Sequence, residues 1–194
     1  MRVYRFVLVS LALIALFLCP LAINAAPPAL PKDVVAGDAD AEAIQFVIGK
    51  SLLVPGSGNV FGPDNAVTRS EFATVLAKAR GIQAVKPSAP TFSDLKASDS
   101  SYPYVEALVK AGVIPVASSK KFEPEAPVKR ADMAVWIINA LGLAKEAASI
   151  KEPVLMANDE DKVPQHAIGA MTLAYRSDRQ LLGYRRGRLA APME

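Results

Sequence analysis

The feature that most restricts how this chain can fold is an internal repeat, in which the sequence aligns with itself without gaps at an offset of 61 residues. The two copies share identical residues at Asp33/Asp94, Phe61/Phe122, Pro63/Pro124, Val67/Val128, Arg69/Arg130, Ala73/Ala134 and Gly81/Gly142. A period longer than one helix is typical of repeated supersecondary units, each of which buries its apolar face against a neighbour. The sequence therefore predicts a chain of similar units that pack on one another.

Each copy is predicted to form a helix, a loop and a second helix, so the predicted fold class is mainly α. Apolar residues recur at helical spacing in the first helices, at Ala43, Ile44, Val47 and Ile48 and at Tyr104, Val105, Leu108 and Val109. The second helices repeat the pattern at Phe72, Val75, Leu76 and Ala79 and at Met133, Trp136, Ile137, Ala140 and Leu141. Each loop ends in Phe-x-Pro, whose aromatic ring is expected to plug the core. Gly81 and Gly142 stand where a left-handed residue commonly closes a helix.

The second helix of the first copy begins within residues 67–72, whose sequence is VTRSEF. Thr68 and Glu71 have the spacing of a capping box, in which each side chain bonds a backbone N–H group of the first turn. Arg69 falls in that turn, where the helix dipole disfavours a cation. Because local helix physics does not favour this arginine and it recurs as Arg130, it is a candidate for function.

The second copy departs from the first at its helix start. Lys129 replaces the capping threonine and Asp132 replaces the glutamate, so Asp132 is expected to remain as the capping carboxylate. The lost hydroxyl cap costs about 1 kcal/mol if nothing compensates. Lys129 also adds a cation beside Arg130, which would suit an acidic ligand.

A third copy begins, but the sequence ends where its capped second helix should start. Ala170, Met171, Ala174 and Tyr175 lie at helical spacing, and residues 181–183 resemble the turn after a first helix. The predicted boundaries are 33–86 for the first repeat, 90–144 for the second, 145–158 for a charged linker and 159–194 for a partial third repeat with a basic tail.

Residues 1–25 have the order of a secretory signal, with Arg2 and Arg5 first, then an apolar run, then small residues before a cleavage site after Ala25. An uncleaved anchor is the alternative, although the run is shorter than the ~20 residues that span a bilayer comfortably. Cys19 is the only cysteine, and Leu18 before it disfavours lipidation. Residues 26–32 then form a proline-rich leader.

Charge and residue usage argue against several functions. The formal net charge is +3, and two of the positive charges lie in the signal segment, so nothing indicates nucleic acid or an anionic membrane as a partner. With one histidine, His166, and no cysteine after the signal, the familiar nucleophile–base sets are not available. No His/Cys cluster indicates a metal site. We therefore predict no catalytic residue, no metal and no cofactor, and expect a protein that is not an enzyme.

Taken together, the motifs resemble the S-layer homology (SLH) family. They are an aspartate-led entry, an amphipathic helix, Phe-x-Pro, the hydrophobic-Thr-Arg-x-Glu-Phe helix start and a closing Ile or Leu beside a glycine. The resemblance covers about residues 33–82 and 92–143 well, and 159–192 in part. It implies three helical units in a pseudo-threefold spindle, incomplete here because the third unit lacks its Arg-bearing helix. It also implies an exported bacterial protein of the cell wall or envelope.

In that family the arginine of the Thr-Arg-x-Glu start helps to line a glycan groove, a role that carries over to Arg69 and Arg130, with Lys129 beside the second. A guanidinium offers a carboxylate a planar fork, each charge-assisted hydrogen bond is worth about 1.5–3 kcal/mol, and a helix N-terminus adds backbone donors. The alternative for both arginines is a structural ion pair with a carboxylate such as Asp64 or Glu125. Trp136 and His166 are expected to be structural.

The resemblance implies a non-catalytic envelope protein that binds cell-wall polysaccharide, either an acidic secondary polymer or a peptidoglycan-linked glycan. The alternative is a degenerate module that binds no glycan and associates with another envelope protein or with copies of itself. In both cases the only predicted membrane contact is through the signal segment.

Overall fold

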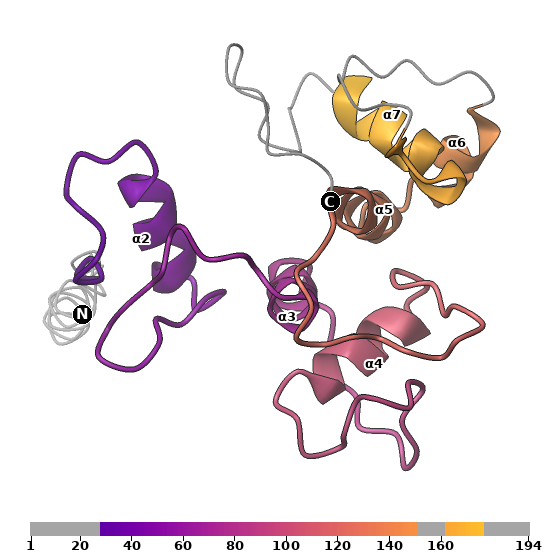
Figure 1. Cartoon of the computed structure of the whole chain (residues 1–194), viewed down its shortest axis with the longest axis horizontal. Helices are drawn as coiled ribbons and strands as arrows, with labels where there is room; N and C mark the ends of the chain where they lie inside the picture. The colour runs from indigo at the N-terminus through magenta and orange to yellow at the C-terminus, as the bar shows by residue number, and fades with distance from the viewer. Residues whose placement is uncertain (1–27, 151–161, 177–194) are drawn as a thin grey trace, which may run out of the picture.

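The computed structural model describes residues 28–150 and 162–176 of the 194-residue chain. The predicted signal segment, most of the predicted linker and the basic tail lie outside these residues. The elements in chain order are α2 (Ala41–Gly49), α3 (Arg69–Ala79), α4 (Tyr102–Lys110), α5 (Arg130–Ala140), α6 (Ala144–Ser149), the 3-10 helix η2 (Gln165–Ala167) and α7 (Ile168–Arg176) (Figure 1). Within the described ranges, extended backbone pairs only in isolated β-bridges. The prediction of a mainly α fold is confirmed.

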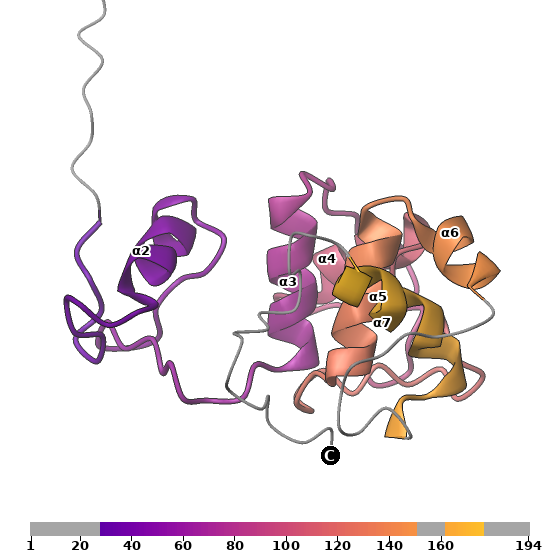
Figure 2. The ribbon, with the colours of Figure 1, turned by 90° about the horizontal axis from the view of Figure 1, so that it is seen from above.

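The helices pack in pairs that join neighbouring repeats. α3, the second helix of the first repeat, packs on α4, the first helix of the second repeat, and α5 packs in the same way on α7. Figures 1 and 2 show both pairs side by side, with α2 standing apart from them. Periodicity predicts each helix but not this exchange of partners, because any complementary apolar stripe can cover another.

The aspartate that opens each repeat holds the Phe-x-Pro turn of the same repeat. The Asp33 carboxylate accepts hydrogen bonds from the backbone N–H groups of Phe61 (2.8 Å) and Gly62 (2.6 Å). Asp94 accepts the equivalent bonds from Phe122 (2.8 Å) and Glu123 (2.9 Å). These two clamps show that the two repeats fold alike at the offset of 61 residues.

Both clamps favour the charged carboxylate. The N–H groups of Phe61 and Gly62 lower the pKa of Asp33 below its ordinary value. For Asp94, burial acts to raise the pKa, but the N–H groups of Phe122 and Glu123 together with the charge of Lys121 outweigh it, and the pKa is lowered.

The predicted helix ends are also observed. Gly81 and Gly142 follow α3 and α5 with φ of +65° and +79°. After the first helices, Gly112 has φ of +71°, whereas the equivalent position in the first repeat is Ser51, with φ of +55°. A Cβ atom is strained in this region, so the first repeat carries a conformational cost that the second avoids.

The apolar cores follow the pairing of the helices. The largest joins α3, α4 and α5 around Tyr102, Phe122 and Trp136. A second joins α5, α6 and α7, and it buries three residues of the stripe predicted for the third copy, Ala170, Met171 and Ala174. A third lies beside α2 and buries Val34, Ala41 and Ile44.

Two segments differ from their predicted description. The linker predicted from residue 145 begins with α6, and α6 packs on α7. The proline-rich leader is attached to the first repeat, since Pro31 is buried and the Pro28 carbonyl accepts a hydrogen bond from Gln45 at 2.7 Å. Among the described residues, no helix has the length and apolarity needed to cross a membrane.

Candidate ligand-binding groove

The starts of α3 and α5 lie side by side. Thr68 forms an antiparallel bridge with Pro127, and the N–H groups of Arg69 and Ser70 donate to the carbonyls of Ala126 (2.9 Å) and Pro124 (3.0 Å). The interface between the repeats is therefore held by backbone hydrogen bonds.

The capping box of α3 is formed. The Glu71 N–H donates to Thr68 Oγ1 at 3.2 Å, and the Thr68 N–H donates to Glu71 Oε2 at 2.9 Å. With Arg69 and Ser70 also bonded, the first-turn N–H groups of α3 are occupied. The expectation that this helix start offers backbone donors to an anion is therefore wrong for α3, because the second repeat already supplies their acceptors.

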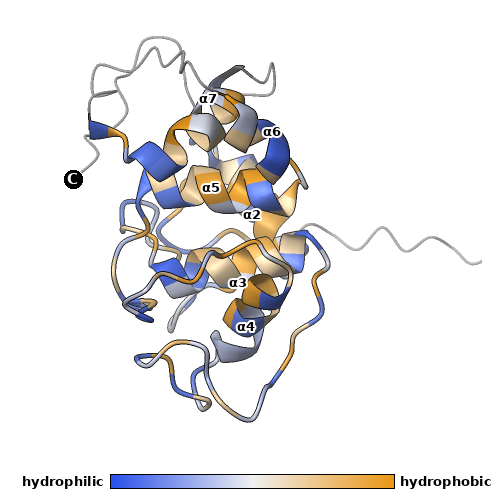
Figure 3. Cartoon of the chain, turned by 90° about the vertical axis from the view of Figure 1, so that its right-hand side faces the viewer, coloured by the Kyte–Doolittle hydropathy of each residue, from blue (hydrophilic) through white to orange (hydrophobic). Residues whose placement is uncertain are grey.

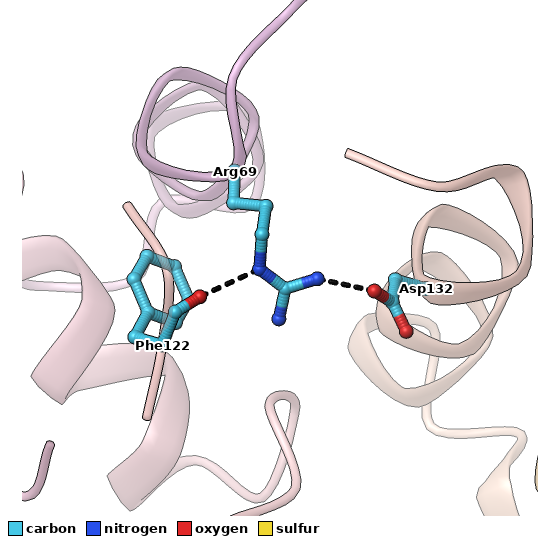
Figure 4. A network of polar contacts seen from close by, with 3 residues as sticks. All are labelled: Arg69, Phe122 and Asp132. Atoms are coloured by element: carbon cyan, nitrogen blue, oxygen red, sulfur yellow. Dashed lines mark hydrogen bonds and ion pairs between the residues drawn. The ribbon is translucent and has the colours of Figure 1, made fainter. Parts of the chain in front are cut away.

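Arg69 reaches across this interface into the second repeat (Figure 4). Its Nε donates to the Phe122 carbonyl at 2.6 Å, and its Nη1 forms an ion pair with Asp132. The guanidinium carbon lies 5.3 Å from the ring centroid of Phe122 and 5.0 Å from that of Trp136, within the range of cation–π attraction. Two aromatic rings, a carbonyl and a carboxylate thus fix the guanidinium.

This geometry corrects the role predicted for Asp132. Asp132 was expected to cap α5, but its carboxylate pairs with Arg69, and the N-cap residue Lys129 makes no side-chain capping bond. The physical reason is that Lys129 has no hydroxyl to accept a first-turn N–H. The structural ion pair considered for Arg69 does form, but with Asp132 and not with Asp64 or Glu125.

A groove of about 770 Å³ opens beside Arg69, between the second repeat and the start of the third. Its polar lining includes Arg69, Lys121, Asp132, Asn139 and His166, and Trp136 contributes part of the apolar wall. Two formal positive charges, on Arg69 and Lys121, face the one carboxylate of Asp132. The groove therefore offers an anionic ligand cations, an amide and an aromatic surface.

Sequence reasoning missed two of these side chains. His166 was expected to be structural, but it is exposed at η2 and lines the groove. Lys121 was treated only as the end of a loop, although the repeat holds a signal, since Val60 stands at the equivalent position of the first repeat. Trp136 is 2% exposed, in line with the core role expected for it.

The other predicted ligand residues do not line this groove. Arg130 is partly buried at the start of α5, and Lys129 is exposed before it. In the described part of the chain, the only ion pair is between Arg69 and Asp132, so Arg130 has none there. The offset of 61 residues places Arg69 and Arg130 at successive interfaces, and one groove does not collect both. Within residues 28–150 and 162–176, no three His, Cys, Asp or Glu side chains form a group that could hold a metal ion.

These features define a helical repeat protein whose units interlock and whose candidate groove lies between repeats. Residues 32–73 and 91–134 match the S-layer homology domain family, and the chain carries two S-layer homology repeats. The resemblance inferred from the helix starts and the Phe-x-Pro turns is confirmed.

Curated relatives support the same family. The chain is 28% identical to an S-layer protein of Bacillus licheniformis over 59% of its own length and 13% of the relative. It is 32% identical to the middle cell wall protein of Brevibacillus brevis, over 63% of this chain and 12% of that protein. An endoglucanase of a Bacillus species is 27% identical over 68% of this chain and 14% of the enzyme. The chain therefore spans about an eighth of the length of these relatives, and it is similar to proteins of bacterial surfaces and cell walls.

Proposed function

We propose that this chain is an exported protein of the bacterial cell envelope that binds an acidic cell-wall polysaccharide, without catalysis, in the groove beside Arg69. The two S-layer homology repeats and the relatives named as S-layer and cell wall proteins support the envelope role. Two relatives are named as an endoglucanase and a cell wall amidase, and the chain spans 14% and 19% of them. The proposal assigns this chain attachment and no reaction.

The observation that carries the proposal is the fixed guanidinium of Arg69. Its Nε and Nη1 are held by Phe122 and Asp132, while Nη2 makes no hydrogen bond within the described residues. A guanidinium has five N–H donors, so three remain for a ligand. Because the rings of Phe122 and Trp136 already hold the group, a carboxylate on a sugar would bind it with little further loss of side-chain entropy.

Lys121 and His166 supply the remaining polar contacts in this proposal. Lys121 is exposed and adds a second positive charge near Arg69. His166 offers ring nitrogens to sugar hydroxyl groups from the opposite wall of the groove. Lys129 and Arg130 lie outside this groove, and we propose that they contact the same polymer at the start of α5.

Co-sedimentation with purified cell-wall sacculi tests the proposal. The chain from Ala26 onward should bind intact sacculi and lose binding once the acid-labile polymer has been stripped. Lys121→Ala and His166→Ala should each weaken binding about tenfold, because each removes one ligand contact from an exposed side chain. Lys96→Ala, which removes an exposed lysine outside the groove, is the matched control.

Other results would change the assignment. Unchanged binding after stripping would make peptidoglycan itself the ligand. No binding by a chain that circular dichroism shows to be folded would reject the glycan proposal. Equal binding by Lys121→Ala, His166→Ala and the wild-type chain would place the ligand outside this groove.

A further inference from the structure

The first repeat exposes an apolar surface that the second repeat buries. In the second repeat, Leu108, Val113, Ile114 and Phe122 are between 0% and 3% exposed. Their equivalents at the offset of 61 residues, Val47, Leu52, Leu53 and Phe61, are all partly exposed. We call these four residues of the first repeat the open α2 face.

Local folding does not account for this difference. The Asp33 and Asp94 clamps hold the same two positions of their turns, and Ser51 and Gly112 share the left-handed conformation. What differs is the covering helix, since α3 packs on α4 whereas the described residues bring no helix onto α2 (Figures 1 and 2). The open α2 face is therefore the surface on which a helix like α3 is missing.

The composition of α2 points the same way. Its sequence, AEAIQFVIG, carries one charged residue, Glu42, and Figure 3 shows most of the helix as hydrophobic. A helix that is apolar on most sides is normally buried. Phe46 is nevertheless 60% exposed, whereas its equivalent Ala107 is 3% exposed.

The polar contacts of the missing helix can be inferred from the second repeat. There, Arg69 of the covering helix bonds the Phe122 carbonyl and Asp132. The equivalent acceptors in the first repeat are the Phe61 carbonyl and Glu71. Within the described residues, the Phe61 carbonyl and Glu71 Oε1 accept no hydrogen bond.

A groove of about 560 Å³ lies at this position and is lined by Leu53, Phe61, Glu71 and Val75. Val75 occupies the place of Trp136, so the first repeat has room for a larger side chain from its partner. The groove thus combines an apolar wall with two acceptors suited to one arginine.

We propose that the open α2 face binds, from a different envelope protein, a helix of the α3 kind. This helix carries an arginine in its first turn for Phe61 and Glu71. It also presents small residues that allow close packing, as α3 does with Ala73 and Ala77, which are fully buried. The inference is independent of glycan binding, because it uses neither Lys121 nor His166.

The count of helices argues against a second copy of this chain as the partner. The described residues contain three first helices, α2, α4 and α7, and two second helices, α3 and α5. Both second helices are already packed on first helices of the same chain. Self-association would therefore leave open α2 faces uncovered.

A labelled peptide tests the inference directly. The probe is a synthetic peptide of residues 66–82, which contains the whole of α3, and its fluorescence anisotropy is followed as the chain from Ala26 onward is added. We expect saturable binding that falls about tenfold or more for the chain variant Leu53→Asp. Val116→Asp, at a residue that is 45% exposed in the second repeat, is the matched control and should bind as the wild type does. A peptide with Arg69→Ala should bind about tenfold more weakly.

Hydrogen exchange locates the peptide and separates the outcomes. We expect it to protect residues 47–61 and to leave residues 108–122 unchanged. Binding that Leu53→Asp does not weaken, or no binding at all, would overturn the inference. Protection of residues 47–61 before peptide is added would show that the chain already covers the face. A dimer in sedimentation velocity that Leu53→Asp dissociates would make a second copy the occupant.

Discussion

The Arg69 guanidinium forms an ion pair with the Asp132 carboxylate, joining the starts of two helices whose residues are 63 positions apart in the sequence. The two side chains are 16% and 25% exposed, so the pair is only partly screened by solvent. It replaces the capping box that the second repeat lacks, because the carboxylate at that position serves the neighbouring repeat.

Removing Arg69 is expected to destabilise the fold. Arg69→Met should lower the free energy of unfolding by about 1–3 kcal/mol, since it leaves Asp132 and the Phe122 carbonyl without their donor. Asp132→Asn keeps an acceptor and should cost about 1 kcal/mol. Urea unfolding of both single variants and the double variant gives the coupling energy, expected to be about 0.5–3 kcal/mol. Additive single effects would contradict an ion pair that matters for stability.

Ser51 is expected to be a site where glycine stabilises. Ser51 has φ of +55°, and Ser51→Gly removes the strained Cβ, so we expect a gain of about 0.5–1 kcal/mol in the free energy of unfolding. Gly112→Ala places a Cβ at the equivalent position of the second repeat and should lose about 1 kcal/mol. Thermal unfolding followed by circular dichroism measures both. Opposite signs are the expected result, and a loss for Ser51→Gly would contradict it.

Restoring a cap to α5 should also stabilise the chain. Lys129→Thr places a hydroxyl at the N-cap, whose backbone already has the extended conformation of a cap, with φ of −78° and ψ of 146°. We expect a gain of about 0.5–1 kcal/mol in the free energy of unfolding. The matched control is Lys129→Ala, which removes the charge without adding a hydroxyl. If both variants have the same stability, the hydroxyl does not cap.

Gly169 should not tolerate a side chain. A Cβ atom there would lie 2.0 Å from the backbone oxygen of Ala147, so Gly169→Ala must separate α6 from α7. Overpacking of this kind is expected to cost about 1–3 kcal/mol of the free energy of unfolding. Gly49→Ala is the control, because a Cβ there meets only Pro28 side-chain carbons at 3.4 Å. Denaturant midpoints should fall for the first variant and stay equal or rise for the second.

The two aspartate clamps predict acid sensitivity. The pKa values of Asp33 and Asp94 are lower in the folded chain than in ordinary aspartates, so their contribution is fully present above the unfolded pKa of about 3.9. It is lost as the pH falls through the lower folded values. Melting temperatures should therefore drop below about pH 4, and drop less in Asp33→Asn with Asp94→Asn, although the double variant starts lower at pH 7. An equal acid-induced loss in both proteins would contradict the role of the clamps.

Much of the local structure was predictable, as α3 illustrates. The spacing of Thr68 and Glu71 predicts the capping box that forms, and Gly81 has the predicted positive φ. The site was predicted in part, since Arg69 was identified but Lys121 and His166 were not. His166 reaches the groove only because α7 packs on α5, a long-range contact that the spacing of apolar residues does not encode.

The sequence by itself determined the units of this protein. The 61-residue repeat, the apolar stripes, the cap at Thr68 and the glycines after the helices all depend on contacts within a few residues, which spacing and residue type reveal. The tertiary structure alone decided the partners. It paired α3 with α4, brought Arg69 to Phe122 and Asp132, and left α2 uncovered among the described residues, because similar apolar stripes are interchangeable until the path of the whole chain selects among them.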